Sequence, residues 1–210
     1  MEIIDLTHVI DEKMPVFPGT EPPKIIQKNT IKKDGFAEKL LTMYTHTGTH
    51  IDAPAHMIEG GYSLSDFSIE KFIGRGIIIP LESNDIIELN YLKKFETQIK
   101  KASFVLFYSG WDDFWGRKEY FNGFPSLSIE AAKYLVGFDL KGVGIDAVSI
   151  DGMDSKNFDV HHILLKKNLI IIENLKNLKK LINKNFELYI TPLKIKDLDG
   201  SPVRAFGKKL

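Results

Sequence analysis

The alternation of hydrophobic and polar positions divides the chain into short strands and helices. Runs rich in β-branched and aromatic residues predict strands at Ile3–Leu6, Lys24–Ile31, Glu38–Thr45, Gly76–Leu81, Ser103–Tyr108, Gly142–Ile145, Leu169–Ile172 and Glu187–Thr191. Helical spacing between them predicts helices at Ser68–Ile73, Ile86–Lys100, Ser128–Val136, Asp159–Lys167 and Asn174–Ile182. Because the two kinds of element intermingle throughout, we expect a single mixed α/β domain over residues 1–210.

Two segments interrupt this pattern and are predicted to be long loops. One, Pro15–Pro23, contains four prolines around a glycine. The other, Gly110–Pro125, holds both tryptophans of the chain. Exposed aromatic side chains are unfavourable, and burial of Trp111, Phe114 and Trp115 against a second copy of the chain would remove them from water. The sequence therefore predicts a homo-oligomer, either a dimer or a tetramer.

Composition narrows the class of protein. The 210 residues are 43% hydrophobic and 27% charged, with 28 basic and 28 acidic side chains. This balance argues against nucleic acid or an anionic membrane as a partner. The chain has no cysteine, which excludes a thiolate nucleophile and Cys-ligated zinc. The start lacks the pattern of a signal peptide and the apolar runs are too short to span a bilayer, so we expect a cytoplasmic protein.

The most informative segment is YTHTGTHIDAPAH, residues 44–56, which concentrates three of the six histidines with one aspartate. His46 and His50 have the spacing of two ligands on one helical face, but the intervening Thr-Gly-Thr is a poor helix. The segment is better interpreted as a loop after a strand. His50 and Asp52 would point to the same side of an extended chain, and Gly48 would let the backbone approach a bound group closely.

Imidazole and carboxylate without sulfur form the ligand set of zinc or manganese in hydrolytic sites. The competing interpretation is an ordinary polar surface loop, which would be favoured for a lone histidine. Three histidines and an aspartate on a glycine-turned, proline-stopped loop favour a metal site instead.

These residues also resemble a known family. The segment at 46–56 matches the HxGTHxDxPxH signature of the cyclase-like metal-dependent hydrolases, which include bacterial kynurenine formamidase and isatin hydrolase. Four further segments resemble the family in the same order: DLTH (Asp5–His8), MPVFPGT (Met14–Thr20), GIDAVSID (Gly144–Asp151) and VHHILLKKNLIIIENL (Val160–Leu175). The resemblance implies the kynurenine formamidase-like, swivelling β/β/α fold over nearly the whole chain.

The resemblance also implies roles for individual residues. The proton donor and acceptor would be His56, and an aromatic substrate ring would stack on Phe17, where family formamidases have tryptophan. One or two Zn²⁺ ions per subunit, or Mn²⁺, would be held by the predicted ligands, with the aspartate able to bridge two ions: His46, His50, Asp52, His161 and Glu173. The family spacing selects His161 rather than His162.

Local chemistry agrees with some of these assignments. Glu173 ends an apolar strand, where a carboxylate is costly to desolvate unless it is paired or bound to a cation. His161 shares a helical face with two leucines, which also fits a buried structural histidine. Asp146 and Asp151 follow a strand and are expected to order loops or orient the ligating imidazoles. His8 is expected to be structural.

Together these features predict a metal-dependent amide hydrolase, most simply an arylformamidase acting on an N-formylated aromatic amine such as N-formylkynurenine, in tryptophan catabolism. Water activated by the cation would attack the amide carbonyl, and His56 would move the proton to the leaving nitrogen. Alternatives are a cyclic amide hydrolase of the isatin type, a non-catalytic metal-binding protein, and a binding module for a small anionic molecule.

Overall fold

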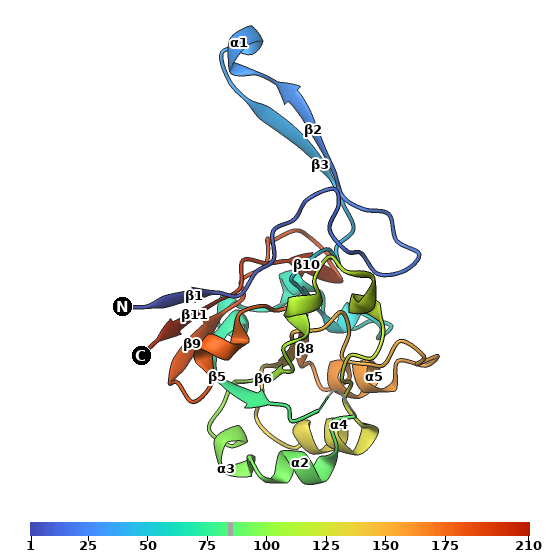
Figure 1. The fold of residues 1–210 in the computed structure, drawn as a ribbon, viewed down its shortest axis with the longest axis vertical. Helices are drawn as coiled ribbons and strands as arrows, with labels where there is room; N and C mark the ends of the chain where they lie inside the picture. The colour runs from blue at the N-terminus through green and yellow to red at the C-terminus, as the bar shows by residue number, and fades with distance from the viewer. Residues whose placement is uncertain (84–85) are drawn as a thin grey trace.

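The computed structural model describes residues 1–83 and 86–210, and most of its strands belong to one sheet (Figure 1). Within these residues a nine-stranded sheet has the order β1-β11-β9-β5-β6-β7-β8-β4-β10. Its strands are β1 (Ile3–Asp5), β4 (His50–Asp52), β5 (Ile73–Pro80), β6 (Phe104–Tyr108), β7 (Gly142–Ile145), β8 (Ile170–Glu173), β9 (Phe186–Tyr189), β10 (Gly200–Pro202) and β11 (Phe206–Lys209). Strands β5 to β8 are parallel, and antiparallel strands extend the sheet at both sides.

The central strands are buried on both faces because their side chains alternate between two apolar cores. In β6, Val105 and Phe107 pack with the helices of one core, whereas Phe104 and Leu106 pack into the other. The helices are α2 (Leu89–Lys93), α3 (Glu96–Ile99), α4 (Ile129–Leu135) and α5 (Asp159–Leu165), and they gather on one side of the molecule (Figure 1). The predicted mixed α/β fold is confirmed.

A two-stranded arm projects from this body (Figure 1). It consists of β2 (Lys24–Asn29) and β3 (Glu38–Thr42), joined through the short helix α1 (Ile31–Asp34), and it forms a separate two-stranded sheet. The residues of β3 are all exposed. The arm is followed along the chain by the histidine-rich segment, so the arm and the predicted site are adjacent in sequence.

Several predicted elements differ from the structure. The helix predicted at Ile86–Lys100 begins at Leu89 and is broken into α2 and α3. The helix predicted at Asn174–Ile182 is wrong: Asn174 and Asn177 adopt left-handed backbone angles, which end helical geometry, and a 3₁₀ turn follows at Leu178–Leu181. The segment at Ser68–Ile73 is also a 3₁₀ turn, over Ile69–Phe72. The C-terminal strands β10 and β11 were not predicted.

The aromatic loop Gly110–Pro125 packs against its own chain. Trp111 is 5% exposed and donates its indole N–H to the carbonyl of Tyr120. Phe114 and Trp115 are partly buried against the same core. Trp111 therefore needs no second copy for burial, whereas Phe114 and Trp115 keep part of their surface exposed, and the homo-oligomer stays a prediction. None of the helices in the described parts of the chain has the length and hydrophobicity needed to cross a bilayer.

Candidate metal centre and pocket

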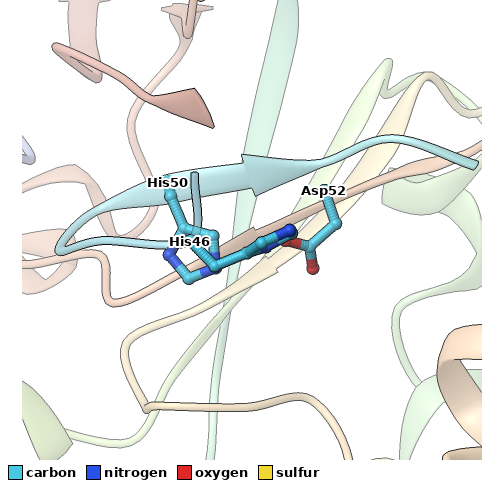
Figure 2. A group of neighbouring side chains, drawn as sticks. All are labelled: His46, His50 and Asp52. Carbon is cyan, nitrogen blue, oxygen red and sulfur yellow. The ribbon is translucent and has the colours of Figure 1, made fainter. Parts of the chain in front are cut away.

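The histidine-rich segment contains a buried strand, which corrects the expectation of a loop. Gly48 turns the chain with a φ of 65°, and β4 then begins at His50 between β8 and β10. The carbonyl of Gly48 accepts a hydrogen bond from His50 Nδ1 at 2.8 Å. Figure 2 shows the consequence: His46, before the turn, approaches the side chains of His50 and Asp52 on the strand.

The structure brings together the five side chains predicted to bind metal. His50 and Glu173 are cross-strand partners in the β4–β8 pair, with His50 Nε2 3.6 Å from Glu173 Oε2. His161, in α5, places its Nε2 3.4 Å from Glu173 Oε1 and 3.7 Å from Asp52 Oδ2. Asp52 Oδ1 lies 2.7 Å from His46 Nδ1 and 3.3 Å from His50 Nε2. Asp52 therefore lies between two groups of ligand atoms, one with His46 and His50 and one with His161 and Glu173.

The outward nitrogens of two of these imidazoles have fixed partners. Asp151 accepts a hydrogen bond from His161 Nδ1 at 2.6 Å and further bonds from the backbone N–H groups of Val160 and His161. With its Nδ1 bonded to the Gly48 carbonyl, His50 is oriented in the same way. In both residues Nε2 is left facing the carboxylates, which is the arrangement by which proteins present histidine to a metal.

The imidazoles and carboxylates of this cluster shift one another's pKa values. Burial alone would lower the pKa of His46, but hydrogen bonds and charge from Asp52 and Asp199 outweigh it and raise the pKa to about 9. Burial of His161 is likewise outweighed by Asp151 and Glu173, which raise its pKa to about 10. Although burial opposes ionisation of Asp52, its histidine neighbours hold the pKa of that carboxyl well below its ordinary value. The carboxylates therefore require positive charge beside them.

The donor set fits a divalent cation. Asp52 is 1% exposed, and its Oδ2 has no hydrogen-bond partner among the described residues. An ionised oxygen buried without a donor is costly, and a cation would satisfy it. Three imidazoles and two carboxylates, without sulfur, suit zinc or manganese. The assignment of these residues as ligands, and the number and identity of the ions, remain predictions.

His56 lies beside this cluster, in a 3₁₀ turn at Pro54–His56. Its ring is tilted by 35° against that of His46, with centroids 3.9 Å apart. Its Nδ1 lies 3.5 Å from Asp199 Oδ2, and the same oxygen lies 3.1 Å from His46 Nε2. Burial lowers the pKa of His56, so unlike His46 it favours the neutral imidazole.

The cluster lies in a cavity of about 440 Å³. Its apolar walls come from segments that are far apart in the sequence: Pro15, Val16, Phe17, Tyr44, Met57, Val148 and Phe158. The size is in the usual range for small-molecule sites. Phe17 lines this cavity and is 39% exposed, and its contact with a substrate ring stays a prediction.

Two predicted supporting residues are placed as expected. Asp146 accepts hydrogen bonds from the backbone N–H groups of Ser109, Gly110 and Trp111, and it thereby orders the start of the aromatic loop. His8 stacks on Trp115 with ring centroids 3.9 Å apart, and its backbone N–H is bonded to Thr49 Oγ1. It therefore belongs to the packing around the site rather than to its cavity wall.

Sequence reasoning missed Asp199 and Asn174. Asn174 donates to the Gly48 carbonyl and accepts from the hydroxyl of Tyr120, so it holds the turn before β4. Its position directly after Glu173 is the signal that could have identified it. Asp199 lies in a Leu-Asp-Gly-Ser-Pro sequence that resembles an ordinary turn. Its proximity to His46 depends on the pairing of β10 with β4.

Comparison with known proteins agrees with this site. Residues 4–152 match the family described as putative cyclase. The chain is 37% identical over 209 residues to an uncharacterised protein of Methanocaldococcus jannaschii, covering 99% of both chains. It is 32% identical over 209 residues to a kynurenine formamidase of Geobacillus thermodenitrificans, covering 99% of this chain and 97% of the relative.

Solved structures show the same fold. An isatin hydrolase bound to the product analogue thioisatinate superposes with a TM-score of 0.89 at 24% identity, covering 98% of this chain and 91% of the other. A protein described as a predicted metal-dependent hydrolase from Bacillus stearothermophilus gives a TM-score of 0.82 at 30% identity, covering 98% and 97%. The chain belongs to the putative cyclase family, and the predicted class of metal-dependent hydrolase is confirmed.

Proposed function

We propose that this protein is a metal-dependent amide hydrolase, most specifically an arylformamidase that releases formate from an N-formylated aromatic amine. The observation that carries the proposal is the position of His56, an imidazole whose pKa is lowered by burial, next to two groups of histidine and carboxylate side chains that share the buried Asp52, in an aromatic-lined cavity. The 32% identity to a kynurenine formamidase over almost the whole chain supports the same reaction.

Two groups of residues would have different roles in hydrolysis, one in binding the cation and one in proton transfer. His46, His50, Asp52, His161 and Glu173 would hold the cation. When bound, a divalent cation acidifies water and polarises a carbonyl oxygen. His56 is within reach of the same space, and because its Nδ1 faces Asp199, its Nε2 is the atom free to take a proton and pass it to the leaving nitrogen.

The cavity wall fits an aromatic amine as the leaving group. Phe17, Tyr44 and Phe158 offer π-faces, and the remaining wall is largely aliphatic. Stacking and apolar burial would hold the aryl ring while the formyl group reaches the metal ligands. Phe17 would contribute through its ring face, because offset stacking does not require the larger indole found in related formamidases.

The proposal is tested by assaying purified protein, loaded with Zn²⁺ or Mn²⁺, on N-formylkynurenine, formanilide and isatin. We expect formate release from the two formamides. Turnover of isatin alone would establish the cyclic amide alternative. Bound metal without turnover of any of the three would favour the non-catalytic metal-binding protein.

We further propose that residues 1–210 form one domain and that the protein assembles as a homo-oligomer through its arm. A two-stranded sheet is marginal by itself in water, yet this arm exposes Ile26, Leu40 and Leu41, and Met43 and Tyr44 are exposed directly after it. A second copy covering the arm would bury these side chains. Because Tyr44 also lines the cavity, the partner would lie close to the substrate. The cytoplasmic location and the role in tryptophan catabolism stay predictions.

A further inference from the structure

Asp199 occupies a position that neither the metal ligands nor the proton carrier accounts for. It precedes β10, in the C-terminal segment, and its side chain lines the cavity. One of its oxygens, Oδ2, lies 3.1 Å from His46 Nε2 and 3.5 Å from His56 Nδ1. A single carboxylate oxygen thus lies between the nitrogens of a predicted ligand and of the predicted proton carrier.

The backbone holds this carboxylate in place. The carbonyl of Asp199 accepts a hydrogen bond of 2.8 Å from the N–H of Ala53, which follows β4. Next along the chain, Gly200 pairs with Asp52 in the β10–β4 register. A Cβ at Gly200 would lie 2.4 Å from Cε1 of His46, so only glycine lets the His46 ring lie against this strand. Asp199 and His46 are therefore fixed to the same two-strand frame.

The other imidazoles of the cluster show what such a contact does. His161 has its second nitrogen bonded to Asp151, and His50 has its own bonded to the Gly48 carbonyl. Asp199 gives His46 the corresponding partner through Nε2. It differs from the other two partners because it also reaches a second ring, that of His56.

We propose that Asp199 is a positioning residue that sets the His46 and His56 rings relative to each other. By accepting hydrogen from both, it would present His46 Nδ1 to the cation and direct His56 Nε2 toward the substrate. Its effect on turnover rests on the proposed function. Its effect on metal affinity does not, because that can be measured without substrate.

The primary variant is Asp199→Ala, which removes the acceptor, with Asp199→Asn retaining one acceptor oxygen. The matched control is Asp197→Asn, which removes the same charge from an exposed position in the same segment. Zinc affinity is measured by competition with a chromophoric chelator. We expect affinity to fall about tenfold or more in Asp199→Ala, the usual loss when an outer partner of a ligand is removed. Asp199→Asn should retain part of it, and Asp197→Asn should match wild type.

Turnover is then compared at saturating metal. We expect Asp199→Ala to lower kcat about 10- to 100-fold while KM changes by less than about threefold, because the acid–base group is displaced but the apolar wall is intact. In a His56→Ala background the same substitution should lower kcat no further. Independent, multiplying effects of the two substitutions would overturn the proposal, as would an Asp199→Ala variant with wild-type metal affinity and kcat.

A direct role of Asp199 in substrate binding would change KM rather than kcat. If Asp199 instead bound the ammonium group of an amino-acid substrate, Asp199→Ala would raise KM for N-formylkynurenine and leave KM for formanilide unchanged. That result, with kcat preserved, would overturn the positioning role. If no formamide is hydrolysed by wild type, the proposed function fails, while the chelator competition still decides whether Asp199 positions His46.

Discussion

His50 and Glu173 face each other directly across the antiparallel pair of β4 and β8. Their side chains come within 3.6 Å although they lie in opposite parts of the chain. Because β8 continues the parallel strands at the centre of the sheet, the pairing joins the histidine-rich segment to the carboxyl edge where α/β proteins commonly bind ligands. The metal centre is therefore a consequence of strand register, because a one-residue slip of β4 would move His50 to the opposite face of the sheet from Glu173.

The pairing of His50 with Glu173 predicts what happens when either predicted metal ligand is removed. We expect His50→Ala and Glu173→Gln each to lose most bound metal, because each removes a ligand from a cross-strand pair. A bound cation stabilises the folded protein by about 2.7 kcal/mol when its concentration is 100 times Kd. Chelation should therefore lower the Tm of wild type and leave the Tm of both variants almost unchanged, as measured by calorimetry. A wild-type response to chelator in Glu173→Gln would contradict its role as a ligand.

His56 should behave differently from His50. If His56 only moves protons, His56→Ala should keep nearly all of its metal while turnover falls by about 10²–10⁴-fold, the usual contribution of a positioned acid–base group. His50→Ala should lose metal and turnover together. Elemental analysis and formate release on the same samples separate the two cases. Equal metal loss in both variants would make His56 a ligand, and full activity of His56→Ala would rule out the mechanism.

The residues that could be identified from sequence are those with a local signal. His46, His50 and Asp52 fall within seven positions of one another, and a glycine turn between them is visible in the sequence. His161 and Glu173 carry no such signal alone, since His161 also fits a buried structural histidine and Glu173 also fits a strand-end glutamate in water. They were selected by resemblance to a family. Asp199 could not be found in either way, because only the pairing of β10 with β4 brings it to His46.

Two of the missed strands share one cause. β4 and β10 contain three residues each, which is too short for an alternating pattern to emerge. Their extended conformation comes from neighbouring strands, so tertiary pairing determines it. The helix predicted after Glu173 failed for a local reason instead, because Asn174 is held by Gly48 and Tyr120 in a left-handed conformation.

His8 should make stability depend on pH. Burial, with a smaller effect of Lys176, lowers its pKa to about 4, while in the unfolded chain the value is about 6.5. The unfolded state therefore binds more protons in this window, and stability falls as pH drops from about 6.5 to 4. The full shift corresponds to about 3 kcal/mol as an upper limit.

The matched variant is His8→Phe, which keeps an aromatic ring to stack on Trp115 and cannot be protonated. Urea unfolding of chelated protein at pH 7.5 and pH 4.5 measures the difference. We expect wild type to lose more stability than His8→Phe over this interval, because the carboxylates titrate equally in both. Identical losses would show that His8 is not buried as a neutral ring.

The arm should control assembly. Ile26 and Leu40 are cross-strand partners on β2 and β3, and their side chains are 43% and 47% exposed. If a second copy covers this face, the double substitution Ile26→Asp and Leu40→Asp would place charges in the interface at a cost of several kcal/mol. We expect light scattering to report an oligomer for wild type and a monomer for this variant at micromolar concentration.

The control is Lys39→Asp, which lies on β3 at an exposed polar position and should remain oligomeric. Metal content should be equal in all three proteins, because the ligands lie in the body of the molecule. A wild-type monomer would contradict the assembly, and an oligomeric double variant would move the interface away from the arm.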